Sequence, residues 1–320
     1  MWFWLAVTAL LFWSGSDLFS KIGCRGNDKY AHLKMVIAVG VVMGVHAMYE
    51  IFVGGTIVTW HVILTYLPVS LLYISSMTLG YIGLRYIELS ISSPICNSSG
   101  ALVAVLCFLT GTLDESIEGT MRLAVIGAVA LVCIGVIGLG IIESREDDDL
   151  RRARQEASNY KYAKSWLALF LPVAYCLLDA AGTFADTFVL DLLAGEAEAA
   201  GLFATAEECS SYAASSANCA YELTFLFAAV CCVIYVALIK KERFTVKQEG
   251  PKYIGALCET AGQFAYIFGY RTCSNLRTDH FRILCRFRCM EPHLLKREAV
   301  LEALCDDPAG CDRYRNAWGI

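Results

Sequence analysis

Charged side chains are scarce in this 320-residue sequence. Asp, Glu, Lys and Arg make up 18% of the residues and hydrophobic residues make up 57%, whereas soluble domains average about 25% charged and about 45–50% apolar residues. The composition therefore argues against a soluble globular protein. A net charge of −5 also leaves no basic excess. Because nucleic-acid-binding proteins need a basic surface, nucleic acid is not an expected partner.

Enzyme signatures are missing as well. The sequence contains no GxSxG nucleophile elbow, no Walker-type phosphate loop, no HExxH zinc motif and no Gly-rich dinucleotide turn after a strand. The 15 cysteines lie mostly singly within apolar stretches, where we interpret them as small buried hydrophobic side chains. The sequence thus predicts no enzyme, no cofactor and no metal site.

Long apolar runs, in contrast, are abundant, and the mean hydropathy is +0.52. A helix needs roughly 20 mainly apolar residues to cross a bilayer, and an open sheet edge cannot exist within lipid. We therefore predict an all-α, multi-pass protein of the cell membrane. The predicted spans are residues 2–20, 33–53, 62–84, 91–109, 123–142, 166–190, 223–239 and 253–270.

Two connections between the predicted spans are long. Residues 143–165 contain the run EDDDLRRARQ, which is typical of a solvated loop, and we interpret them as a linker with five spans before it and three after it. Residues 191–220 are rich in Ala, Glu and Ser and predict an exposed hairpin or short helix. Cys209 and Cys219 could form a disulfide there only if that connection faces an oxidising compartment.

Lys and Arg gather in the connections after the first, fifth and seventh predicted spans, as at Lys29, Arg154 and Lys240. These three connections fall on one side of the membrane, because an even number of spans separates them. The positive-inside rule predicts that this side is cytoplasmic. The charge pattern therefore predicts an N-terminus outside the cytoplasm.

The order of short motifs in the first five predicted spans resembles the EamA-type transporters of the drug/metabolite transporter superfamily. Trp13, Gly15 and Lys21 match the end of the family's first helix, and ISSPICNSSG matches the start of its fourth. An acidic loop at Asp114 and Glu115 and the Gly-rich run AVIGAVALVCIGVIGLGII follow in the family's order. The sequence departs from the family where Ser14 separates Trp from Gly, and where the usual Gly-Glu-Arg of the acidic loop is absent.

The resemblance implies ten helices in two repeated bundles of five. Residues 1–142 would be the first half and residues 166–270 a partial second half with three helices. It also implies alternating-access transport of a small metabolite or drug-like solute, with proton coupling left open, and both termini in the cytoplasm, which conflicts with the charge pattern. The expected partners are the lipid bilayer and the solute, and a homodimer is left open. The alternative is a membrane protein without transport activity.

Residues 271–320 break the helical pattern and predict a non-membrane tail, because they are rich in charge and cysteine and contain no apolar run long enough to cross a bilayer. The spacing from Cys285 to Cys289 matches no recognised zinc module. Read one nucleotide out of frame with free choice of synonymous codons, the stretch from Asn275 can encode ISAPTTSAYCAVSVAW, which parallels ISSPICNSSGALVAVL. We hypothesise that a one-base insertion or deletion near codon 270 replaced the last two helices.

Polar and ionisable side chains inside the spans are the candidates for solute or proton binding, because a buried charge costs about 2.5–3.5 kcal/mol on insertion scales. His46 with Glu50, and Glu259 with Gln263, share a helix face at i, i+4 spacing. The candidates are Asp17, His46, Glu50, Asn97, Asp179, Glu259 and Gln263. Asp179 and Glu259 rank first because they lie deepest in their spans and are expected to face one central cavity. An interfacial pair with Lys21 is the alternative interpretation of Asp17, and a packing residue that of His46.

Small residues predict close helix packing in two places. Gly40 and Gly44 form a GxxxG pattern, and Gly135 and Gly138 lie in the Gly-rich fifth span. Small side chains let two membrane helices approach closely. We therefore expect helix contacts at both positions.

Overall fold

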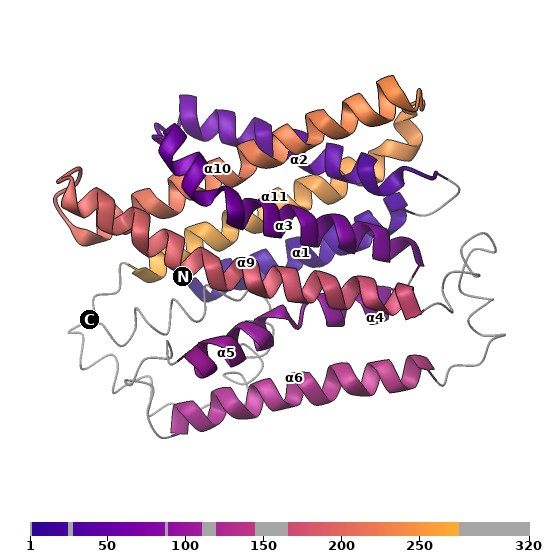
Figure 1. Cartoon of the computed structure of the whole chain (residues 1–320), viewed down its shortest axis with the longest axis horizontal. Helices are drawn as coiled ribbons and strands as arrows, with labels where there is room; N and C mark the ends of the chain where they lie inside the picture. The colour runs from indigo at the N-terminus through magenta and orange to yellow at the C-terminus, as the bar shows by residue number, and fades with distance from the viewer. Residues whose placement is uncertain (1, 25–27, 87–88, 111–119, 145–165, 275–320) are drawn as a thin grey trace.

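The computed structural model describes residues 2–24, 28–86, 89–110, 120–144 and 166–274, and every regular element within them is a helix (Figure 1). This confirms the all-α class. The helices are α1 (Trp2–Cys24), α2 (Ala31–Phe52), α3 (Trp60–Tyr86), α4 (Leu89–Cys96), α5 (Ser99–Thr110), α6 (Thr120–Ser144), α9 (Trp166–Ala199), α10 (Ala206–Val233) with the π-helical turn η1 (Ile234–Ile239), and α11 (Val246–Ser274).

Several of these helices can cross a bilayer by length and composition. Among the described residues, five helical stretches are long and apolar enough, which agrees with a membrane protein. They are Ala31–Phe52, Trp60–Tyr86, Ser92–Thr110, Phe170–Ala199 and Ala206–Ile239. The predicted linker beyond Ser144, the acidic loop at 111–119 and the tail beyond Ser274 lie outside the described residues.

The prediction that residues 191–220 form one long connection is wrong. Helix α9 continues to Ala199, and α10 already begins at Ala206. Thr205 caps α10, because its hydroxyl accepts a hydrogen bond from the backbone N–H of Glu208 while the Glu208 side chain returns to the Thr205 backbone N–H. Residues 191–220 contain few large apolar side chains, which is why the sequence predicts a connection there. Most of them are helical nevertheless, because Ala has the highest helix propensity and the capping box starts a helix whether or not the segment is apolar. Cys209 and Cys219 are therefore buried free thiols on α10.

The fourth predicted span is two helices rather than one. Helix α4 ends at Cys96 and α5 begins at Ser99, so Asn97 and Ser98 form a turn between them. The Ser98 hydroxyl donates to the carbonyl oxygen of Ile95 at 2.7 Å. Serine and asparagine side chains compete for backbone hydrogen bonds and favour such breaks. The turn therefore places the polar side chains of Asn97 and Ser98 beside the neighbouring helices.

Helices from the two halves of the chain pack in pairs: α1 lies against α11, α2 against α10, and α3 against α9 (Figure 1). The main core lies among these helices and includes Met35, Val39, Val69, Phe225 and Ala256. Burial of apolar side chains between paired helices therefore joins residues before 87 to residues after 165.

The two glycine predictions have opposite outcomes. A Cβ added at Gly40 would lie 2.5 Å from the carbonyl oxygen of Phe225, and one at Gly44 would lie 2.8 Å from Leu226. The GxxxG pattern thus does mark the close approach of α2 to α10. Among the described residues, a Cβ at Gly138 would meet nothing within 4 Å, because α6 lies at the outer side of the bundle beside α4 and α5 (Figure 1). The prediction of close packing is wrong at Gly138.

Two of the three basic connections lie at the same end of the bundle, as the charge pattern predicts. Lys34, at the start of α2, donates to the carbonyl oxygen of Arg243, which precedes α11. Lys34 also pairs with Asp28 at 2.8 Å and with Glu249 at 3.3 Å, and Lys252 pairs with Glu249 at 2.9 Å. We call this ion-pair network of Asp28, Lys34, Glu249 and Lys252 the basic-end network. The third basic connection lies outside the described residues.

Candidate functional site

Three carboxylates from three helices converge inside the bundle: Asp17 of α1, Asp179 of α9 and Glu259 of α11. Glu259 interacts electrostatically with both other carboxylates. All three side chains are partly buried. The structure therefore brings the two top-ranked candidates, Asp179 and Glu259, within electrostatic range of each other and adds Asp17 to them. We call these residues the central carboxylates.

Neutral donors from neighbouring segments hold the central carboxylates. Ser93 of α4 donates to Oδ2 of Asp17 at 2.5 Å, and Asn97 donates from Nδ2 to the Ser93 hydroxyl at 2.9 Å. Asn97, a predicted site residue, thus reaches Asp17 through Ser93. Ser99, the first residue of α5, forms a hydrogen bond with Asp179. The break between α4 and α5 is therefore what supplies polar contacts to two of the three carboxylates.

Glu259 has its own donors and lies among tyrosines. Ser16 and Trp13 of α1 form hydrogen bonds with its carboxylate. Tyr81, Tyr175 and Tyr221 each interact electrostatically with Glu259. Tyr81 is only 6% exposed, and among the described residues its hydroxyl has no hydrogen-bond partner. A buried hydroxyl without a partner costs about 1–3 kcal/mol, so this tyrosine carries a cost that packing alone does not explain.

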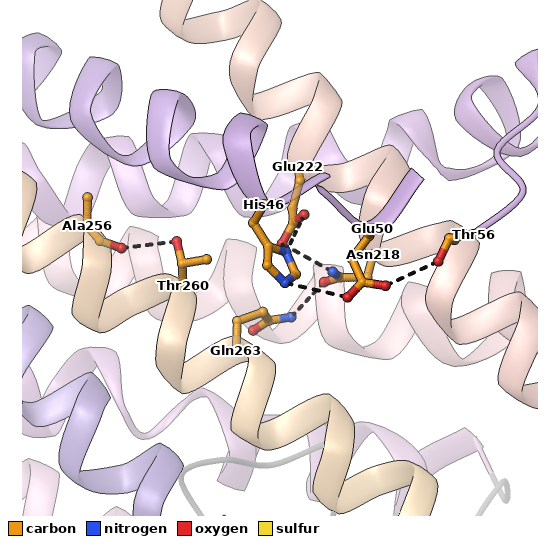
Figure 2. Close-up of polar contacts among 8 residues, drawn as sticks. All are labelled: His46, Glu50, Thr56, Asn218, Glu222, Ala256, Thr260 and Gln263. Carbon is orange, nitrogen blue, oxygen red and sulfur yellow. Dashed lines mark hydrogen bonds and ion pairs between the residues drawn. The ribbon is translucent and has the colours of Figure 1, made fainter. Parts of the chain in front are cut away.

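A second polar cluster joins α2, α10 and α11 (Figure 2). Nδ1 of His46 lies 2.9 Å from both carboxylate oxygens of Glu222. Asn218 donates to Glu222 Oε1 at 3.2 Å, and Gln263 donates to Asn218 Oδ1 at 3.4 Å. Glu222 is 0% exposed. We call the set His46, Glu50, Asn218, Glu222 and Gln263 the histidine cluster.

The predicted pair of His46 and Glu50 is present, but it is not the shortest contact of the imidazole. Nε2 of His46 lies 3.9 Å from Oε1 of Glu50, a full ångström farther than Nδ1 lies from Glu222. Thr56 donates to the other Glu50 oxygen at 3.3 Å. Gln263 belongs to this cluster as well, whereas Glu259, four residues earlier, faces the central carboxylates.

Sequence reasoning missed Glu222. Apolarity placed the start of the seventh span at residue 223, so Glu222 fell just before that span and outside every predicted span. The helical signal that could have found it was the capping box at Thr205 and Glu208, which starts a helix that carries Asn218 and Glu222 four residues apart on one face.

Asp186 has a structural contact of its own. Tyr66 of α3 donates to Asp186 of α9 at 2.5 Å, and Tyr73 donates to Thr183 at 3.1 Å. These bonds tie α3 to α9. Within the described residues no group of three or more His, Cys, Asp or Glu side chains could hold a metal ion.

No protein-family model and no curated protein matches this chain. The resemblance to EamA-type transporters therefore stays a prediction that rests on the order of the motifs. The geometry offers two separate features for chemistry, the central carboxylates and the histidine cluster. Both are rich in acidic side chains, which accept hydrogen bonds when they are ionised.

Proposed function

We propose that this chain is a membrane transporter that moves a small solute by alternating access, with the solute bound at the central carboxylates. The convergence of Asp17, Asp179 and Glu259 carries the proposal. A single charged side chain at the centre of a membrane helix costs about 2.5–3.5 kcal/mol on insertion scales. Three such groups at one place are therefore better explained by binding than by stability.

The pairing of the helices supports a repeat relation between the two halves. Suppose that α1 exchanges places with α9, α2 with α10, and α3 with α11. The contact of α1 with α11 then becomes the contact of α9 with α3, and the contact of α2 with α10 is unchanged. This is the pattern that a two-fold relation produces. In repeat-built transporters the solute site lies at the interface of the repeats, and Asp17 and Asp179 come from opposite sides of such an interface.

The chemistry around the central carboxylates favours a solute with a positive charge. Ionised carboxylates only accept hydrogen bonds, and among the described residues Asp179 accepts from Ser99 while Glu259 accepts from Ser16 and Trp13, all of them neutral donors. Tyrosine rings can stack on an organic cation, and the Tyr81 hydroxyl is available for an acceptor on the same solute. A small organic amine or quaternary ammonium compound fits these groups best.

The experiment is uptake into proteoliposomes that contain the purified full-length chain. We expect saturable uptake of labelled tetraethylammonium and of primary amines, and no uptake of organic anions of similar size. Asp179→Asn and Glu259→Gln should lower cation uptake at least about tenfold, equivalent to about 1.4 kcal/mol. Asp191→Asn is the matched control, because Asp191 is an exposed carboxylate on the same helix as Asp179. Unchanged uptake in both central variants would contradict the proposal.

One observation favours the alternative, a membrane protein without transport activity that includes the inactive product of a shifted gene. Helices α4 and α5 pack against α9, and α6 packs against α4 and α5, but within residues 166–274 no helices occupy the equivalent place beside α1. Sequencing the DNA across codons 265–320 tests the shifted-frame hypothesis. A folded protein that moves none of the solutes would favour this alternative.

A further inference from the structure

The histidine cluster places one base between two carboxylates. Nδ1 of His46 faces Glu222 at 2.9 Å, and Nε2 faces Glu50 at 3.9 Å. Nε2 is buried and, among the described residues, has no hydrogen-bond partner. The two acids differ in their access to water, because the Glu50 side chain is 20% exposed and that of Glu222 is 1% exposed. The imidazole therefore bridges an acid near the solvent and an acid in the interior.

The charges of the cluster do not cancel when all three groups are ionised. Two carboxylates and one imidazolium leave a net charge of −1, and one added proton makes the set neutral. A net charge is costly in a low-dielectric interior, so the set gains from binding one proton. Within the described part of the chain, His46 is the only basic side chain that pairs with either acid.

Among the described residues, the other side chains that face His46, Glu50 and Glu222 are neutral. From α11 it is faced by Gln263 and by Phe264, whose ring centroid lies 5.7 Å from that of His46. From α10 it is faced by Asn218, and Tyr221 interacts electrostatically with Glu222. Thr56 contacts Glu50 from the connection between α2 and α3. These neighbours supply hydrogen bonds but no opposite charge.

We propose that His46, Glu50 and Glu222 form a proton-binding relay that couples proton movement to the conformational change of the bundle. Glu50 takes a proton from water and passes it to Nε2 of His46. The imidazole in turn releases its Nδ1 proton to Glu222. Over these transfers water loses one proton and Glu222 gains one, the numbers of protons on Glu50 and on the imidazole are unchanged, and the imidazole changes from the Nδ1–H to the Nε2–H tautomer.

The position of the relay explains how a proton would change the structure. The bond from His46 to Glu222 joins α2 to α10, one of the three helix pairs that connect the two halves. Hydrogen bonds to an ionised group are roughly twice as strong as neutral ones. Protonation of Glu222 therefore weakens this link between the halves. The coupling to transport rests on the proposed function, whereas proton binding by the relay does not.

The test uses the full-length chain in lipid nanodiscs and needs no solute. Infrared difference spectra between about pH 5 and about pH 9, the range in which histidine titrates, should show a protonated carboxyl band and imidazole bands. Glu222→Gln should remove the component of the carboxyl band that Glu222 contributes, and His46→Gln should remove that component together with the imidazole bands of His46, while the other four histidines and the central carboxylates keep their own bands. His61→Gln is the matched control, because His61 pairs with Glu196 at 2.8 Å but is 63% exposed. It should leave the carboxyl band unchanged.

Hydrogen exchange gives the second measurement. Amide protection of α2 and α10 should fall at the acidic end of this range in the wild type and should not depend on pH in Glu222→Gln. If His46→Gln does not fold, Glu50→Gln serves in its place and should slow the appearance of the Glu222 band after a pH jump. Folded variants with unaltered spectra would overturn the relay. If the relay titrates but the chain moves no solute, the proposed transport function is overturned and the proton site is not. If Glu222→Gln still transports with the wild-type pH dependence, the coupling between the relay and transport is overturned.

Discussion

In the basic-end network each charge has an opposite charge beside it, whereas Asp179 and Glu259 in the interior lie among neutral donors. Lys34, with a side chain only 3% exposed, contacts both Asp28 and Glu249, and Lys252 contacts Glu249. Asp179 and Glu259 instead contact serine hydroxyls and an indole. The first arrangement suits a permanent link between segments, and the second suits a partner that comes and goes.

The largest expected effect comes from breaking the paired network. Lys34→Met removes the ion-pair partner of Asp28 and one of the two ion-pair partners of Glu249. Removal of one member of a buried ion pair costs about 3–5 kcal/mol, because the remaining charge is uncompensated. Thermal unfolding in detergent should show this loss. Lys29→Met, at an exposed lysine of the same connection, should change the unfolding temperature little. Equal stability of the two variants would contradict the structural role of the network.

A smaller loss is expected where the two halves touch most closely. Gly40→Ala places a Cβ against the carbonyl oxygen of Phe225 and the Ala229 side chain, and overpacking of this kind costs about 1–3 kcal/mol. Gly138→Ala meets open space and should be neutral or slightly stabilising, because Ala favours helix. The same unfolding assay checks both variants. If Gly138→Ala is the more damaging change, the packing of α6 differs from that described above.

Acid should weaken the basic-end network. Burial by itself raises the pKa of Asp28. Its hydrogen bonds with Lys34 and with the Tyr30 backbone N–H together lower the pKa by more than burial raises it, so the pKa lies below the ordinary 3.8. A group with a depressed pKa stabilises the folded state above its unfolded pKa, and this contribution is lost as the pH falls through the folded pKa. Below about pH 4, wild-type stability should therefore fall more steeply than that of Asp28→Asn. Parallel curves would remove Asp28 from the acid response.

The smallest change in stability is expected in the interior. Asp179→Asn keeps a hydrogen-bonding side chain for Ser99 and removes a buried charge, so the free energy of unfolding should change by less than about 1 kcal/mol or rise. Thermal unfolding in detergent at neutral pH measures it. A loss as large as that of Lys34→Met would mean that both regions serve stability, and the comparison between them would fail.

The site was predictable in part. Asp179 and Glu259 could be chosen from depth within their helices, because an acid in an apolar run is conspicuous by itself. The partner of His46 could not be chosen this way. Glu50 was visible four residues away, but Glu222 lies 176 positions away, in a segment whose low apolarity concealed a helix. The pairing of Asp17 with Ser93 likewise depends on how α4 packs against α1.

The sequence by itself determined the helical class, most of the apolar helices and the ends at which two basic connections lie, since apolar run length, helix propensity and loop charge act over one or a few turns. The tertiary structure alone decided that α2 meets α10, that α4 and α5 break beside two carboxylates, and that Glu222 lies against His46. These contacts depend on which helix surfaces fit together, and that is a property of the packed bundle rather than of any local stretch of chain.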